Sequence, residues 1–118
     1  MNEWIVLYVL AAHFIADFVL QTTKTGLNKS KDMTVLTMHV VTYSIALQLL
    51  MIPILGLVNA IVYGSCNFLL HLPTDFISSR LSSKYYKEGR LYAFWKVIGL
   101  DQLAHYAGLI LLLPHFMQ

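Results

Sequence analysis

The chain has 118 residues, of which 58% are hydrophobic and only 12% are charged. Soluble domains carry about 25% charged residues. This composition therefore excludes an ordinary water-soluble globule, and the scarcity of charge excludes nucleic-acid-binding arms and disordered tails. A single cysteine, Cys66, excludes an internal disulfide framework.

Four apolar stretches of membrane-spanning length follow one another along the chain, since a helical span needs about 20 residues. They cover residues 4–21, 34–52, 54–79 and 92–113. The sequence therefore predicts an all-α protein, a four-transmembrane-helix bundle that forms one integral membrane domain over residues 1–118.

The basic residues predict the orientation of the spans, because cytoplasmic loops carry an excess of Lys and Arg. The net charge is only +2, but all eight basic residues fall in or next to two connecting segments, after the first and after the third span. We therefore expect two basic cytoplasmic loops, a short outer hairpin at Pro53–Gly56 and both termini outside (N-out, C-out). The basic residues are Lys24, Lys29, Lys31, Arg80, Lys84, Lys87, Arg90 and Lys96.

Ionisable residues inside the spans are the strongest functional candidates, because a charge at the bilayer centre costs roughly 2.5–3.5 kcal/mol. The first and third spans carry His-x3-Asp, the fourth carries Asp-x3-His, and the second carries one His. Residues four apart share a helix face, and counting from the cytoplasmic ends places all of them at one depth. Pro73 is expected to kink the third span there. The predicted metal ligands are His13, Asp17, His39, His71, Asp75, Asp101 and His105.

Imidazole and carboxylate together suit a divalent transition metal such as zinc, manganese or iron, with zinc or manganese preferred. Seven donors predict either two ions with a bridging carboxylate or one ion surrounded by Asp–His pairs. Such an ion lowers the pKa of bound water towards neutrality. Asp101 or Asp17 would then act as general base, while Gln21 and Gln102 orient water or substrate.

The favoured hypothesis is a metal-dependent hydrolase that cleaves a phosphoester-type bond at the cytoplasmic leaflet. Its substrate would be anionic, such as a lipid headgroup, a lipid-linked phosphate or a nucleotide, because the basic loops would attract it. Specific nucleic-acid recognition is not expected. Membrane lipids are expected partners, and a lipid-facing stripe of Gly56, Ala60 and Gly64 would let a second copy pack as a homo-oligomer.

The alternative hypothesis is non-enzymatic. Polar residues in spans also form interhelical hydrogen bonds or a structural metal site, and chains of Asp and His bind or conduct protons and ions. A closed ligand shell would indicate a structural metal, whereas an open position facing a cavity would indicate catalysis.

The strings HFIADFVLQ, H-x-P-x-D and DQLAH resemble an uncharacterised family of small phage and bacterial polytopic membrane proteins, a domain of unknown function. More loosely, the chain is similar to the membrane-bound metal-dependent hydrolases of bacteria. The resemblance implies a multi-pass protein of the bacterial inner membrane, or of the host membrane if a phage encodes it. For a phage protein, the alternative role is superinfection exclusion or binding to a host protein. It implies a site formed by His13, Asp17, Gln21, His39, His71, Asp75, Asp101, Gln102 and His105.

Overall fold

The fold of residues 2–117 is described by a computed structural model, and no strand occurs among them. The predicted all-α class is therefore confirmed. The elements are α1 (Glu3–Phe14), the π-helical turn η1 (Ile15–Val19), α2 (Thr23–Asn28), α3 (Met33–Leu55), α4 (Leu57–Lys87), α5 (Leu91–Leu112) and the 3₁₀ turn η2 (Leu113–His115).

Short polar side chains and two glycines set the helix boundaries. The side chains of Asn2, Thr22 and Asp32 accept backbone N–H groups at the starts of α1, α2 and α3. Gly56 separates α3 from α4 and Gly89 follows α4, with φ angles of 80° and 71° that glycine adopts without steric cost.

The predicted outer hairpin is shorter than expected, because α3 continues through Pro53 to Leu55. Proline removes only its own N–H from the helix, and the Gly56 N–H still donates to the Ile52 carbonyl at 2.8 Å. The helix therefore ends where a residue first adopts positive φ, at Gly56, and not at the proline.

The second basic loop is also shorter than predicted. No glycine or proline occurs between Pro73 and Gly89, so α4 runs unbroken through Pro73 to Lys87. Most of the basic residues assigned to this loop therefore lie on helices: Arg80, Lys84 and Lys87 on α4 and Lys96 on α5.

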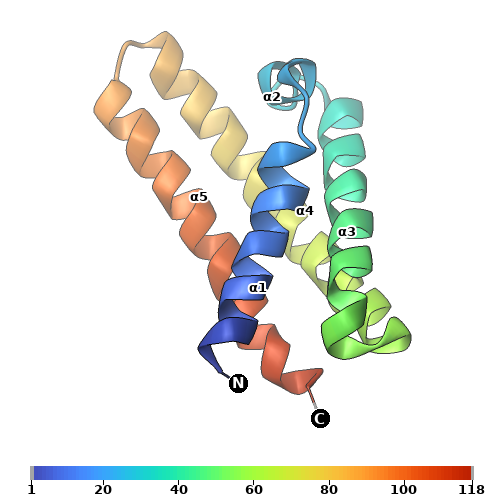
Figure 1. The fold of residues 1–118 in the computed structure, drawn as a ribbon. Coiled ribbons are helices and arrows are strands. Elements are labelled where there is room, and N and C mark those ends of the chain that lie inside the picture. The colour runs from blue at the N-terminus through green and yellow to red at the C-terminus, as the bar shows by residue number, and fades with distance from the viewer. Residues whose placement is uncertain (1, 118) are drawn as a thin grey trace.

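Helix α4 lies at the centre of the bundle, packed against α3 on one side and α5 on the other, while α1 contacts both α3 and α5. Figure 1 shows both termini at one end of the bundle, with α2 and the α4–α5 connection at the opposite end. The basic residues therefore gather at the end that lies away from the termini.

The interior holds many of the polar groups, whereas large apolar side chains cover much of the outside. Leu49, Leu69, Leu103 and Leu111 are each more than 60% exposed, on α3, α4 and α5. The buried polar residues are His13, Asp17, His39, Ser44, Asn67, His71, Asp75, Ser79, Ser82 and His105. This distribution is the reverse of that in a water-soluble bundle, where charged residues are almost never fully buried unless they are paired.

Two helical segments, Met33–Leu55 and Leu91–His115, are long and apolar enough to cross a membrane. Two of the four predicted spans do not meet this criterion. Helix α1 has only 12 residues before the π-turn, and polar residues such as Asn59, Asn67 and His71 lower the hydropathy of α4.

The expected stripe of small residues does not face lipid at two of its three positions. Ala60 is fully buried, and a Cβ atom on Gly64 would collide with Gln48 Cγ and lie 3.2 Å from the Ser44 carbonyl oxygen. Gly64 therefore lets α4 approach α3 within one chain, while Gly56 is exposed. The predicted homo-oligomer stays a prediction.

We expect Gly64→Val to lower the free energy of unfolding by about 1–3 kcal/mol, because the added side chain overpacks the α3–α4 contact. The measurement is thermal unfolding in detergent followed by circular dichroism. The matched control is Gly99→Ala on α5, where a Cβ atom meets no neighbour within 4 Å. Equal stability of the two variants would contradict this account of the helix contact.

Candidate metal centre

His71 of α4 lies at the centre of a buried group of aromatic rings. Its ring stacks on His105 of α5, with centroids 4.1 Å apart and planes 14° apart, and on Tyr43 of α3 at 4.1 Å. Both ring nitrogens of His71 are buried without a hydrogen-bond partner, and the buried Nε2 atom of His105 has Asp101 as an ion-pair partner at 3.2 Å. Since buried polar atoms are nearly always paired, these imidazoles have the chemistry and the surroundings of metal ligands.

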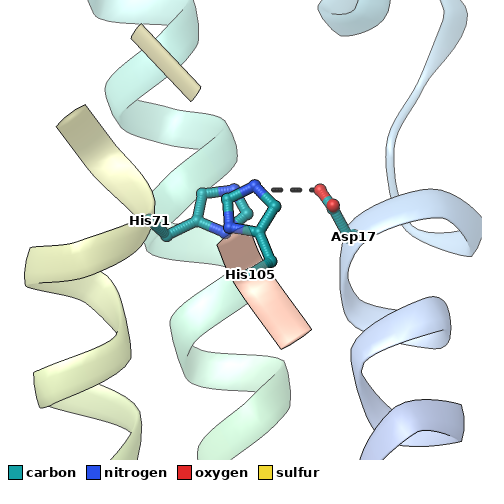
Figure 2. Close-up of side chains that lie close together, drawn as sticks. All are labelled: Asp17, His71 and His105. Carbon is teal, nitrogen blue, oxygen red and sulfur yellow. Dashed lines mark ion pairs between the residues drawn. The ribbon is translucent and has the colours of Figure 1, made fainter. Parts of the chain in front are cut away.

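Two carboxylates face these imidazoles. Figure 2 shows Asp17 opposite the stacked rings of His71 and His105. His71 Nε2 lies 3.8 Å from Asp17 Oδ1 and 3.6 Å from Asp75 Oδ2. His39 Nε2 lies 3.0 Å and 3.4 Å from the same two oxygens. A tetrahedral ion with bonds of about 2.0–2.1 Å separates its ligands by about 3.3–3.4 Å, so these distances are close to those of a ligand shell.

Asp17 reaches this position from the π-turn η1, which follows α1 without a break. Single π-turns within helices are found frequently at functional sites. The turn also changes one prediction: Gln21 lies beyond the helix, and so it is not one helical turn after Asp17.

Two groups of buried residues could hold a metal ion. One consists of Asp17, His71 and His105, and the other of His39, His71 and Asp75, with one ligand atom from each residue and all atoms of a group within 4.8 Å. Both groups contain His71, so they describe overlapping ligand sets around one centre.

His13 joins the buried cluster but belongs to neither group. Gln102 Nε2 donates to Asp101 Oδ2 at 3.0 Å, which orients the amide so that its Oε1 faces His13 Nε2 at 3.0 Å. His13 Nε2 must then carry the proton, and Nδ1 accepts from the Tyr43 hydroxyl at 2.9 Å. With both nitrogens engaged, His13 positions Gln102.

Asp101, the other predicted ligand outside the two groups, also has its own partners. It accepts hydrogen bonds from Ser78 at 2.5 Å and from Gln102. Its Oδ1 lies 3.2 Å from His105 Nε2. Asp101 therefore orients the His105 ring through this ion pair.

Lys29 was predicted only as a residue of the first basic loop, yet it reaches the centre. Its Nζ lies 3.0 Å from Asp75 Oδ1 and 3.2 Å from Oδ2. Both oxygens of Asp75 thus contact Lys29, and Oδ2 also faces the imidazoles of His39 and His71. Nothing in the spacing of the sequence indicates this pair, because it depends on how the segment after α2 folds back onto α4.

A cavity of about 430 Å³ borders the centre. All four residues predicted to be catalytic line it, namely Asp17, Gln21, Asp101 and Gln102. The sequence reasoning missed a polar wall of serines on α4, although their repetition at spacings of three and four is visible once α4 is extended to Lys87. The other lining residues are Phe18, Gly26, Leu27, Lys29, Ser30, Ser79, Ser82, Ser83, Tyr86, Phe94 and Ile98.

Residues 5–118 match a family described as "Protein of unknown function (DUF3307)". No curated protein and no solved structure matches the chain. The predicted membership of an uncharacterised family is therefore confirmed, while the similarity to membrane-bound hydrolases and the phage origin stay predictions. The chain belongs to the DUF3307 family of proteins of unknown function.

Proposed function

We propose that the protein is an integral membrane hydrolase that uses one divalent metal ion, preferably zinc, to cleave a phosphoester-type bond near the cytoplasmic leaflet. The observation that carries this proposal is the buried His71 imidazole, which has no hydrogen-bond partner and faces two carboxylates at ligand-like distances beside a cavity. The predicted manganese and two-ion alternatives are less well supported, since the two ligand groups share His71 and the His–Asp distances are close to those of tetrahedral zinc.

The proposed membrane topology has four crossings with both termini outside, in the bacterial inner membrane. Besides the two apolar spans, it is supported by α4, where Asn67, His71 and Asp75 are buried while large apolar side chains are exposed. Polar residues inside a bundle are compatible with a membrane span if neighbouring helices satisfy them. The gathering of basic residues at the end away from the termini supports a cytoplasmic position for that end in this proposal.

The proposed ligands are His39, His71 and Asp75, because three protein ligands with one open position are typical of catalytic zinc. The open position would face Asp17, which lines the cavity. When bound, the ion would supply hydroxide at neutral pH and polarise the phosphoryl group. Lys29 holds Asp75 in place from outside the shell.

The remaining polar residues have separate roles in this proposal. Asp17 accepts the proton of the attacking water, whose oxygen forms a bond to phosphorus. The bond from phosphorus to the leaving alcohol oxygen breaks, and Asp17 returns the proton to that oxygen. Gln21, whose Oε1 is buried and unpaired, orients the water, and Gln102 holds Asp101 towards His105.

A structural metal is the second candidate, and the same distances favour it. Asp17 Oδ1 lies 3.0 Å from His39 Nε2 and 3.8 Å from His71 Nε2. Asp75 Oδ2 lies at similar distances from the same two nitrogens, 3.4 Å and 3.6 Å. If Asp17 is the fourth ligand, the shell is closed, and the ion stabilises the bundle without activating water.

Purified protein is expected to hold about one zinc ion per chain, measured by inductively coupled plasma mass spectrometry. One tetrahedral shell suffices because both candidate ligand groups contain His71. Loss of a residue that only orients a metal ligand typically weakens metal binding by about 10–100-fold. His71→Ala and Asp75→Ala remove proposed ligands, so they should weaken zinc binding by more than this. His115→Ala, in η2 and outside the cluster, is the control and should keep its zinc. A wild-type protein that binds no transition metal refutes the proposal.

Asp17→Asn separates the two candidate functions. If Asp17 is the general base, the variant keeps its zinc while release of inorganic phosphate from phosphatidic acid or p-nitrophenyl phosphate falls by about 10²–10⁴-fold. If Asp17 is the fourth ligand, the variant loses zinc, and wild-type protein releases no phosphate from either compound.

The topology is tested with single cysteines at Glu3, Lys31 and Glu88 in a Cys66→Ala background. Four crossings predict that a membrane-impermeant maleimide labels position 3 on intact cells, and labels positions 31 and 88 only after permeabilisation. If only the two apolar helices cross, position 31 is labelled together with position 3. The permeabilised sample shows that all three cysteines are accessible.

A further inference from the structure

Two parts of the bundle line the cavity. One side comes from η1, which packs against α1 and α3, and from the segment around α2, which packs against α3. The other comes from α4 and α5, which pack against each other. Figure 1 shows α2 and the start of α5 at the same end of the bundle, on opposite sides of α4. The cavity is therefore bounded by different helices on its two sides, and it is reached from between them.

The lining of the cavity contains polar and apolar groups, and both sides contribute to each kind. We call Lys29, Ser30, Ser79, Ser82 and Ser83 its polar wall. We call Phe18, Leu27, Tyr86, Phe94 and Ile98 its apolar wall. Phe18 is 44% exposed and Leu27 68% exposed, so the apolar wall continues onto the outer surface of the bundle. A fully polar phosphate ester would leave this wall without a partner, whereas a molecule with a hydrocarbon chain would cover it.

A second hollow, of about 370 Å³, adjoins the polar wall and shares Ser30 and Ser83 with the cavity. Arg80 is held there by its own helix, because its guanidinium lies 3.7 Å from the centre of the Phe76 ring and donates to the Phe76 carbonyl oxygen. Four cations against one acid give this hollow a positive potential that attracts anions. Its charged lining residues are Lys31, Arg80, Lys84, Lys87 and Glu88.

We propose that the substrate of this site is a phosphate-bearing amphiphile that enters the cavity sideways from the lipid. Its phosphate contacts Lys29 and the serine wall, and its chain runs over Phe18, Phe94 and Ile98 and leaves between η1 and α5. This inference rests on the proposed function, because Asp17 and Asp101 line the same cavity and repel a phosphate unless a metal ion is bound beside them.

The size of the cavity agrees with this substrate class. Small-molecule sites have volumes of about 300–1,000 Å³, and 430 Å³ is near the lower end of this range. Such a volume holds a phosphate head and the beginning of a chain. The rest of the chain would lie against the exposed apolar surface of the bundle and in the surrounding lipid.

The test is photocrosslinking of zinc-loaded protein in phosphatidylcholine nanodiscs that contain a phosphatidic acid with a diazirine on its acyl chain. Mass spectrometry is expected to locate crosslinks on the peptides that contain Phe18, Phe94 or Ile98. Excess unlabelled phosphatidic acid should remove them, whereas glycerol phosphate and uridine monophosphate at the same concentration should not. If glycerol phosphate or uridine monophosphate competes as strongly as phosphatidic acid does, the assignment of a lipid substrate is overturned.

Ile98→Trp is expected to reduce these crosslinks about tenfold, a loss of about 1.4 kcal/mol of binding, because the larger ring fills the apolar wall. The matched control is Leu103→Trp on α5, at a position that is 63% exposed and does not line the cavity; it should crosslink like wild type. Ser83→Asp, which places a negative charge on the polar wall, should cause the same loss, and circular dichroism verifies that each variant is folded.

Two outcomes distinguish this inference from the proposed function. If zinc-loaded protein crosslinks evenly over its exposed apolar faces, the amphiphile inference fails while the metal site stands. If the protein binds no metal, the proposed function fails, and the inference fails with it.

Discussion

The contact between the His71 imidazole and the carboxylates of Asp17 and Asp75 is the interaction on which the arrangement of the helices depends. These residues come from α4 and from the π-turn after α1, and His39 and His105 add α3 and α5. An ionisable side chain away from water is stable only beside partners. All four long helical segments must therefore converge at one level, and the α4–α3 and α4–α5 contacts position them to do so.

The same constraint explains why polar groups lie inside the bundle, beside its apolar core, while large apolar side chains cover much of the outside. Helix α4 carries Asn67, His71 and Asp75 on its buried side and apolar residues such as Leu69 and Ile77 on its exposed side. Its average hydropathy is lowered in part by polar groups that meet other helices, such as Asn67, His71 and Asp75. Composition averaged along a helix therefore underestimates how apolar the outside of α4 is.

Residues around the centre hold its side chains in fixed orientations, as is typical of metal sites. The hydrogen bonds from Tyr43 to His13, from His13 to Gln102 and from Gln102 to Asp101 connect α3, α1 and α5. Lys29 pairs with Asp75 from the opposite side. The cavity opens where this network meets the serine wall of α4, so ordered polar groups and an accessible volume adjoin each other.

The sequence by itself determined the helical class and the three His–Asp pairs, because a spacing of four places side chains on one helix face. It also indicated four of the residues that line the cavity, namely Asp17, Gln21, Asp101 and Gln102. Only the tertiary structure decided which of the seven predicted ligands face one another, that His13 is engaged by Tyr43 and Gln102, and that Lys29 reaches Asp75. It also placed Gly64 against α3 instead of lipid. The physical reason is that periodicity fixes directions within one helix, whereas distances between helices depend on turns and close packing that no local pattern contains.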